Sequence, residues 1–186
     1  MNPDASILLW IQEYVRCDAL TPAMTFITHL GDGGAVWIIL AAVCLLFGRT
    51  RTAGALAAVS MACNFLVNNV FLKNFVARTR PYEAVEGLSR IIEAQRDFSF
   101  PSGHSGSSFA AATVIFLMCP RRYGISALVL ASAIALSRLY VGVHYPTDVL
   151  AGGLIGAAAA ILVCRGYEML VYKRRAKAPG TGGDTV

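Results

Sequence analysis

Five long apolar runs, each bounded by charged or turn-forming residues, constrain this chain more than any other feature. A helix needs about 20 residues to cross the hydrocarbon layer of a bilayer, within a range of roughly 17 to 25. The runs are close to that size, and they cover residues 22–47, 53–71, 102–119, 125–140 and 148–170. We therefore predict an all-α integral membrane protein, built as a bundle of five to six transmembrane helices.

The composition excludes an ordinary soluble domain. Hydrophobic residues make up 56% of the chain and charged residues 15%, whereas soluble domains carry roughly 25% charged residues. The segment before the first run is acidic as well as basic, unlike the start of a signal peptide, so we expect no cleavage. The five cysteines lack the spacing of a metal or redox site and are interpreted as packing residues: Cys17, Cys44, Cys63, Cys119 and Cys164.

The N-terminal segment has a shorter amphipathic pattern. Residues 6–15 place apolar side chains at Ile7, Leu8, Ile11 and Val15, which share one face of a helix. Because this stripe is too short to span a bilayer, we predict an N-terminal interfacial helix.

Basic residues predict the orientation, because short loops rich in lysine and arginine stay in the cytoplasm. With five spans, one face collects nine basic and two acidic residues, and the other seven basic and nine acidic. The first face is predicted to be cytoplasmic in a cell membrane. We expect residues 1–172 to form the membrane domain, with an extracytoplasmic loop at about 76–101, and residues 173–186 to form a basic, disordered cytoplasmic tail.

Three short polar blocks fall on the predicted extracytoplasmic side. The first contains Lys73 and Arg80, which lie seven residues apart and would face one ligand if the helix continued through both. A basic pair at a helix end is more often an interfacial anchor than a ligand. This block therefore gains its weight from the other two.

The second block is Pro101-Ser102-Gly103-His104, at the start of an apolar run. A capping serine followed by glycine leaves backbone N–H groups and the positive end of the helix dipole available to an anion. An imidazole there has a pKa suited to proton transfer near neutrality. The structural alternative is that Ser102 caps the helix, Gly103 bends the chain and His104 lies at the interface.

The third block joins Arg138, at the end of the fourth run, to His144 and Asp148. The four-residue separation of His144 and Asp148 allows the carboxylate to orient one imidazole nitrogen and leave the other free as a nucleophile. The alternative is a capping aspartate beside an interfacial histidine. Two of the three histidines in the chain nevertheless fall in these blocks.

Other polar residues within the runs have weaker interpretations. His29 and Asp32 lie in the outer half of the first run, where an acidic side chain is costly unless it faces a polar cavity, so both are candidate cavity-lining residues. Residues 82–100 form a long connection suited to a lid or rim. Small residues in the fifth run predict a helix-packing face: Gly152, Gly153 and Gly156.

Together, KNFVARTRP at 73–81, PSGH at 101–104 and SRLYVGVHYPTD at 137–148 resemble the three-part signature of the type 2 phosphatidic acid phosphatase (PAP2) superfamily. That superfamily also includes vanadium haloperoxidases. Many of its members have six membrane helices, whereas we count five and an interfacial helix. The resemblance implies an integral membrane phosphatase.

The resemblance also implies a role for each signature residue. His144 would attack phosphorus to form a phosphohistidine, Asp148 would orient it, and His104 would protonate the leaving oxygen and later activate water. The remaining residues would hold the phosphate oxygens: Lys73, Arg80, Ser102, Gly103 and Arg138. The resemblance implies no metal and no cofactor.

The expected partners are a lipid phosphate and the bilayer, with no nucleic acid. Resemblance to small bacterial undecaprenyl diphosphate phosphatases, which recycle the lipid carrier of cell-wall synthesis, favours that diphosphate over phosphatidylglycerol phosphate, phosphatidate and lipid A phosphates. A phosphotransferase with the same site stays open, whereas a non-catalytic binding protein and a haloperoxidase are disfavoured. The sequence leaves the oligomeric state open.

Overall fold

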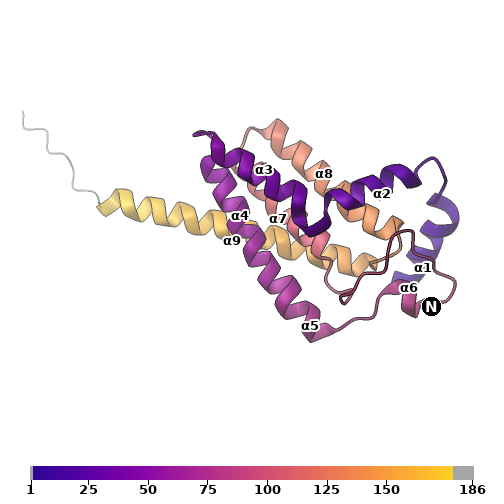
Figure 1. The fold of residues 1–186 in the computed structure, drawn as a ribbon. Helices are drawn as coiled ribbons and strands as arrows, with labels where there is room; N and C mark the ends of the chain where they lie inside the picture. Colours follow the sequence, from indigo (N-terminus) through magenta and orange to yellow (C-terminus); the bar gives the residue numbers. More distant parts are fainter. Residues whose placement is uncertain (1, 178–186) are drawn as a thin grey trace, which may run out of the picture.

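The computed structural model describes residues 2–177, and the regular secondary structure of this part of the chain is entirely helical, with no β-strand (Figure 1). This confirms the predicted all-α class. In chain order the elements are α1 (Pro3–Trp10), η1 (Ile11–Val15), α2 (Thr21–Leu30), η2 (Asp32–Gly34), α3 (Ala35–Leu46), α4 (Arg51–Phe65), η3 (Leu66–Leu72), α5 (Lys73–Val76), α6 (Pro81–Ala84), α7 (Gly103–Met118), α8 (Arg121–Tyr140) and α9 (Pro146–Lys177).

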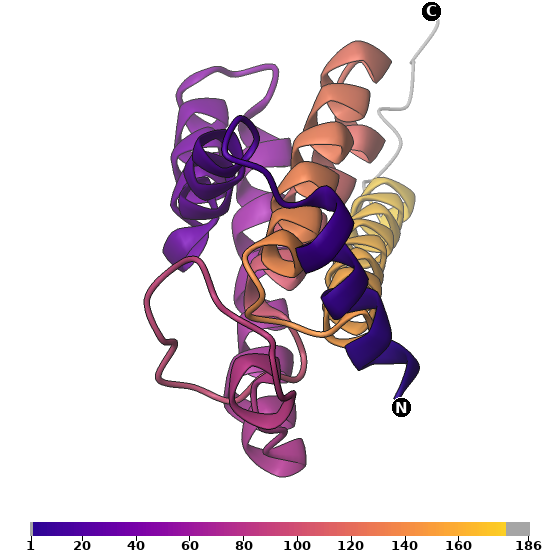
Figure 2. The ribbon, with the colours of Figure 1, turned by 90° about the vertical axis from the view of Figure 1, so that its right-hand side faces the viewer.

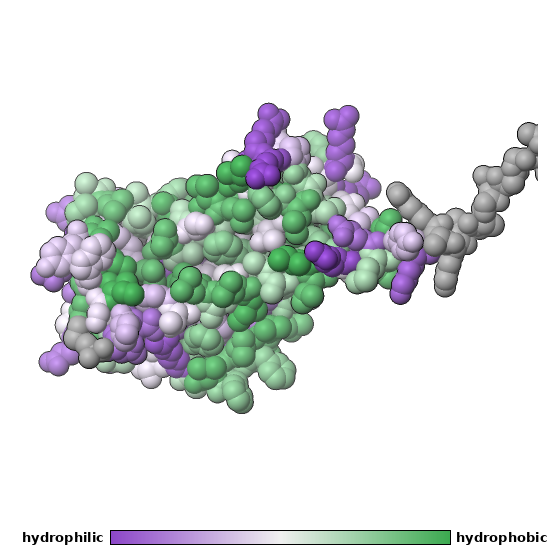
Figure 3. Space-filling model, turned by 180° about the vertical axis from the view of Figure 1, so that it is seen from behind, coloured by the Kyte–Doolittle hydropathy of each residue, from purple (hydrophilic) through white to green (hydrophobic). Residues whose placement is uncertain are grey.

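Helices coincide with all five predicted runs. Three of them, those that begin with α4, α8 and α9, are long and apolar enough to cross a membrane, and α2 with α3 makes a fourth if the bent pair is one span. The central helix α7 has 16 residues. Figure 3 shows a broad apolar surface across the middle of the molecule, with hydrophilic residues gathered toward its edges. The count of five to six spans stays a prediction.

The first run does not form the single straight helix predicted for 22–47. It breaks between α2 and α3, and the two halves are bent by 47°. Gly33 and Gly34 have φ angles of 59° and 73°, in a left-handed region that glycine enters without a Cβ clash. Asp32 therefore lies at this break and not within a continuous helix.

The second run continues beyond its predicted end at residue 71, through η3 and α5 to Val76. Ala77 then adopts φ 47° and ends the helix. The two-turn helix considered for Lys73 and Arg80 is therefore wrong, because the chain is not helical between residues 77 and 80. Arg80 reaches the site from an extended segment instead.

Helix α7 lies at the centre of the bundle and packs against α4, α8 and α9 (Figures 1 and 2). Its residues Ala110, Ala111, Ala112 and Val114 are almost completely buried. The indole Nε1 of Trp37, on α3, donates a 2.9 Å hydrogen bond to Ser108 Oγ on α7. Small side chains thus let three helices approach α7 closely.

Glycines determine how closely α9 approaches α7. A Cβ atom at Gly156 would lie 2.1 Å from the carbonyl oxygen of Gly106, and one at Gly152 would lie 2.3 Å from that of Ser102. Neither position has room for a larger residue, because real Cβ contacts are never this short. The predicted small-residue packing face of the fifth run is confirmed.

The N-terminal helix starts at Pro3, earlier than predicted, and runs through η1 to Val15. Its Leu8 is buried in a cluster with Leu139, Tyr145 and Val149, so α1 packs against the ends of α8 and α9 (Figure 2). Its position in a membrane interface stays a prediction.

At the other end of the chain, α9 continues to Lys177, into the segment predicted as a disordered tail. The rest of that predicted tail, residues 178–186, lies outside the described residues.

Substituting Gly156 by alanine should destabilise the protein, whereas Gly166→Ala should not. The new methyl group at 156 would overlap the α7 backbone and force α7 and α9 apart, at a cost of about 1 to 3 kcal/mol. Gly166 lies on the same helix, and a Cβ atom added there would have no other heavy atom within 4 Å. Alanine at 166 also improves helix propensity by roughly 0.5 to 1 kcal/mol. Thermal unfolding in detergent measures both; equal midpoints for the two variants would contradict the packing argument.

Candidate active site

One cavity of about 730 Å³ brings together six of the residues predicted for the site. They come from five separate parts of the chain, namely the end of the α4–α5 helix, the extended segment before α6, the start of α7, the end of α8 and the turn before α9. The six are Lys73, Arg80, Gly103, His104, Arg138 and His144. The sequence blocks therefore meet at one end of the bundle.

His144 lies in the turn between α8 and α9, where Gly142 adopts φ 78°, and only 1% of the residue is exposed. Burial lowers the pKa of its imidazole, and the nearby Arg80 guanidinium lowers it further, so the ring is neutral at neutral pH. Nη1 of Arg80 lies 3.4 Å from Nε2 of His144. A guanidinium can only donate, so this contact favours the tautomer with the lone pair on Nε2 and the ring proton on Nδ1.

Nδ1 of His144 points toward Asp148, as the four-residue spacing predicts. The Nδ1–Oδ2 distance is 3.5 Å, and Nδ1 makes no hydrogen bond within the described residues. The two side chains are therefore adjacent, separated by slightly more than a hydrogen bond.

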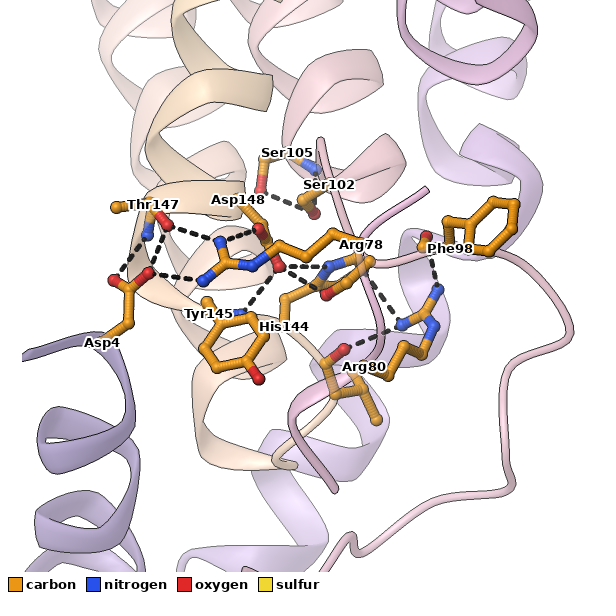
Figure 4. A network of polar contacts seen from close by, with 12 residues as sticks. Asp4, Arg78, Arg80, Phe98, Ser102, Ser105, His144, Tyr145, Thr147 and Asp148 are labelled. Atoms are coloured by element: carbon orange, nitrogen blue, oxygen red, sulfur yellow. Dashed lines mark hydrogen bonds and ion pairs between the residues drawn. The ribbon is translucent and has the colours of Figure 1, made fainter. Parts of the chain in front are cut away.

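The Asp148 carboxylate is completely buried at the start of α9 and is held by three donors (Figure 4). It accepts hydrogen bonds from Arg78 Nη1 at 2.6 Å, from Ser99 Oγ at 2.5 Å and from the Tyr145 amide at 2.9 Å. The sequence analysis missed Arg78 and Ser99. The position of Arg78 inside the first block was the available signal, whereas nothing local marked Ser99.

Arg78 also connects the site to the N-terminal helix. Its Nη2 donates to Asp4 Oδ2 at 2.8 Å, and Asp4 accepts a 2.5 Å hydrogen bond from the Thr147 hydroxyl. Burial alone would raise the pKa of Asp4, but these bonds from Arg78 and Thr147 hold it below its ordinary value. The sequence analysis missed this role because Asp4 and Thr147 are 143 residues apart.

Lys73 and Arg80 are both buried and share one carboxylate. The Lys73 ammonium pairs with Oδ2 of Asp97, and Arg80 Nη2 lies 2.5 Å from Oδ1. Burial would raise the pKa of Asp97, but Lys73 and Arg80 lower it to about 2. The carboxylate is therefore charged at neutral pH, and these pairs are lost only as the pH falls toward 2. Asp97, another residue that the sequence analysis missed, belongs to the predicted lid segment, 82–100.

Arg138, near the end of α8, is the third buried cation. Its Nη1 donates a 2.7 Å hydrogen bond to Thr28 Oγ1 on α2. Its Nε has no hydrogen-bond partner among residues 2–177. A buried guanidinium that lines a cavity and keeps a free donor is suited to bind an anion.

The start of α7 contributes the backbone of Gly103 and the side chain of His104. Ser102 Oγ accepts a 3.3 Å hydrogen bond from the Ser105 amide, and the Ser102 amide donates a 3.0 Å hydrogen bond to the Asp148 carbonyl. Ser102 therefore caps α7 and does not line the cavity, whereas Gly103 does. A direct role for the Ser102 hydroxyl in phosphate binding stays a prediction.

His104 is bound by Asp32, which the sequence analysis considered only as a candidate cavity-lining residue. Nε2 of His104 lies 2.9 Å from Asp32 Oδ1, and Nδ1 of His29 lies 2.8 Å from Oδ2 of the same carboxylate. The side chains of His29 and Asp32 are more than half exposed. Neither residue lines the cavity, but Gly31 and Gly33, on both sides of Asp32, do.

This arrangement can bind a tetrahedral anion and attack it. Three buried cations converge on one cavity with the neutral imidazole of His144, whose Nε2 lies beside Arg80. Within residues 2–177, no three His, Cys, Asp or Glu side chains are grouped so as to hold a metal ion.

Comparison with known proteins gives a consistent result. The sequence model described as "PAP2 superfamily" matches residues 53–172. An undecaprenyl-diphosphatase of Sulfolobus acidocaldarius is 32% identical over 149 residues, which cover 80% of this chain and 71% of that protein. Phosphatidylglycerophosphatase B of Bacillus subtilis is 32% identical over 175 residues, covering 88% and 82% of the two chains.

Two solved structures have the same fold. The crystal structure of Aquifex aeolicus LpxE is similar with a TM-score of 0.77 at 25% identity, over 86% of this chain and 93% of that one. The PAP2-type phosphatidylglycerolphosphate phosphatase of Bacillus subtilis gives a TM-score of 0.71 at 29% identity, over 90% and 85%.

Asp97→Asn tests whether Lys73 and Arg80 bind phosphate. In phosphate-free buffer the variant should lose stability, by about 1 to 3 kcal/mol, because two buried cations lose their carboxylate; the half-exposed position of Asp97 keeps the loss below that of a fully buried pair. Inorganic phosphate should then raise the unfolding midpoint of the variant more than that of the wild type, since no carboxylate competes for the cations.

Glu93→Gln is the matched control, because Glu93 is an exposed acid on the same connection. Equal stabilisation of Asp97→Asn, Glu93→Gln and wild type by phosphate would contradict anion binding at Lys73 and Arg80.

Proposed function

The chain belongs to the PAP2 superfamily of membrane lipid phosphatases, and from that premise we propose that it converts undecaprenyl diphosphate to undecaprenyl phosphate through a phosphohistidine on His144. The observation that carries this proposal is the state of His144. Its buried imidazole is neutral, its ring lines the cavity, and its Nδ1 faces the Asp148 carboxylate. A nucleophile needs the lone pair that a neutral ring keeps.

The shape of the cavity supports a lipid substrate. From the cationic end it extends along α3 and α4, where its lining becomes apolar. Residues in this part include Ile38, Leu45, Ala58 and Phe65. A phosphate head group at His144 would therefore place its hydrocarbon chain beside apolar side chains that face the bilayer interior.

The names of the relatives support a choice among lipid phosphates. Besides the undecaprenyl-diphosphatase of Sulfolobus acidocaldarius, a Bacillus subtilis protein named undecaprenyl-diphosphatase BcrC is 28% identical over 159 residues. Other relatives are named phosphatidylglycerophosphatase B and lipid A 4'-phosphatase. We therefore place the polyprenyl diphosphate first and keep these other lipids as the alternatives that the assay must separate.

In the first step, Nε2 of His144 attacks the terminal phosphorus and the bond from phosphorus to the bridging oxygen breaks. His104 gives its proton to that oxygen, which leaves with undecaprenyl phosphate. Asp148 stabilises the positive charge that develops on the His144 ring. The phosphate oxygens gain charge at the transition state, and the buried cations stabilise it: Lys73, Arg80 and Arg138.

In the second step, water attacks the phosphohistidine. His104, now neutral, accepts a proton from this water as the oxygen bonds to phosphorus. The bond between phosphorus and Nε2 breaks, inorganic phosphate leaves, and the lone pair of His144 is restored. An acceptor alcohol in place of water would give the phosphotransferase reaction instead.

We propose that the site faces the extracytoplasmic side and that the C-terminal end of α9 is cytoplasmic. The α3–α4 and α7–α8 connections lie at the end of the bundle opposite the site (Figure 1). They carry Arg49, Arg51, Arg121 and Arg122, and basic short loops stay in the cytoplasm. A diphosphate released on the outer face would thus reach the site without crossing the membrane.

Purified protein in detergent with EDTA should release inorganic phosphate from undecaprenyl diphosphate, and His144→Ala should reduce the rate to background because the nucleophile is gone. Phosphatidylglycerol phosphate and phosphatidate, at equal mole fraction in the same micelles, separate the alternatives. A higher kcat/KM for either would replace the diphosphate as substrate. Turnover by His144→Ala at the wild-type rate would refute the phosphohistidine.

Asp148→Asn should lower kcat by about 10²- to 10⁴-fold, because an amide cannot offset the charge that develops on His144. A role as helix cap alone predicts a fall in stability with little change in rate per folded molecule. Ser99→Ala is the comparison, since it removes a hydrogen bond from the same carboxylate but leaves its charge. The measurement is the rate of phosphoenzyme formation by rapid quench; equal rates for Asp148→Asn and wild type would reduce Asp148 to a cap.

A further inference from the structure

The turn between α2 and α3 is built around the ring of His104, 72 residues away in the sequence. A Cβ atom at Gly31 would lie 2.6 Å from Cδ2 of His104, so only glycine lets this turn approach the ring. Gly33 and Gly34 then adopt positive φ angles and turn the chain into α3. Asp32 stands between these glycines, and its Oδ1 lies 2.9 Å from Nε2 of His104.

His104 needs a carboxylate because its charged neighbours are cations. Arg138 on α8 and Lys73 on α5 both act on the ring electrostatically. Each disfavours the protonated imidazole that would have to protonate a leaving oxygen. Asp32 is the acidic group that opposes them, and among residues 2–177 it makes the hydrogen bond to the His104 ring.

The Asp32 carboxylate is itself held in place. Its Oδ2 accepts a 2.8 Å hydrogen bond from Nδ1 of His29, on the last turn of α2. The two oxygens therefore serve different histidines, His29 at the surface and His104 at the cavity. Only 15% of the His104 side chain is exposed, against 54% for Asp32.

We propose that Asp32 is a positioning residue for the phosphatase reaction: it accepts the Nε2 proton of His104, stabilises the charged form of this ring and leaves Nδ1 to face the reacting oxygen. This inference rests on the proposed function of His104. In the first step the proton moves from Nδ1 to the leaving oxygen, and in the second Nδ1 takes a proton from water. The Nε2 proton stays on the ring and Asp32 keeps its charge throughout.

The site then contains two carboxylate–imidazole pairs with different tasks. Asp148 acts through His144, the nucleophile, and Asp32 acts through His104, the acid and base. A purely structural role for Asp32, as a link between the α2–α3 turn and α7, would lower stability without selecting among substrates.

The dependence on leaving group separates these roles. Asp32→Asn keeps the side-chain shape and removes the charge. It should slow hydrolysis of phosphatidate, a monoester whose alkoxide leaving group needs a proton, by about 10- to 100-fold. The burst of nitrophenolate from p-nitrophenyl phosphate, which needs no proton donor, should stay within about 3-fold of the wild-type burst. His104→Ala should show the same selectivity, and Asp18→Asn, at an exposed carboxylate in the α1–α2 connection, should match wild type on both substrates.

The ring tautomer gives a readout that needs no turnover. Because the chain has three histidines, ¹⁵N spectra of the imidazoles can be assigned with single substitutions. The expected wild-type signal for neutral His104 is the Nε2–H tautomer, and Asp32→Ala, which removes the acceptor, should shift it toward Nδ1–H.

Equal slowing of both substrates by Asp32→Asn, or an unchanged His104 tautomer in Asp32→Ala, would overturn the inference. If the wild-type protein released phosphate from no lipid, the proposed function would fail by itself. The tautomer would then still decide whether Asp32 orients His104.

Discussion

Buried positive charge is the constraint on which the rest of this structure depends. Lys73, Arg80 and Arg138 are all almost completely buried at one end of an apolar bundle. A charge in such a place costs several kcal/mol or more unless it is paired and hydrogen-bonded. For Lys73 and Arg80 the chain meets that cost with Asp97, which lies on a long connection outside the bundle. Asp4, on the N-terminal helix, pairs in the same way with the partly buried Arg78 beside them.

That constraint explains why elements that look peripheral are attached to the site. Two residues attach the connection between α6 and α7 to the site. Asp97 forms ion pairs with Lys73 and Arg80, and Ser99 donates a hydrogen bond to Asp148. Helix α1 is attached through Asp4, which accepts hydrogen bonds from Arg78 and Thr147. The glycines of α9 complete the arrangement: Gly152 lets Ser102 approach so closely that the Ser102 amide bonds to the Asp148 carbonyl at 3.0 Å. Helix packing and site geometry are therefore fixed by the same contacts.

Local sequence patterns predicted the helices and most of the site residues, but not the partners of those residues. Apolar runs indicated the helices, and the resemblance of the three blocks to the PAP2 signature anticipated a common site, in which six of the predicted residues line one cavity. The partners of those residues left no local signal, because Asp4 lies 143 residues from Thr147 and Asp97 lies 24 from Lys73. The end of the helix at Ala77 was missed for a different reason. Ala77 takes a φ of 47°, which alanine disfavours, so no propensity argument would end a helix there.

The two site histidines are suited to different tasks because their environments differ. His144 is excluded from water, and burial keeps it neutral, which suits a nucleophile that must offer a lone pair. His104 lies at the cavity with its partner carboxylate half exposed, which suits a group that must gain and lose a proton in each proposed cycle. The burial of Asp148 matters for the same reason, because a carboxylate open to water would have a much weaker effect on His144.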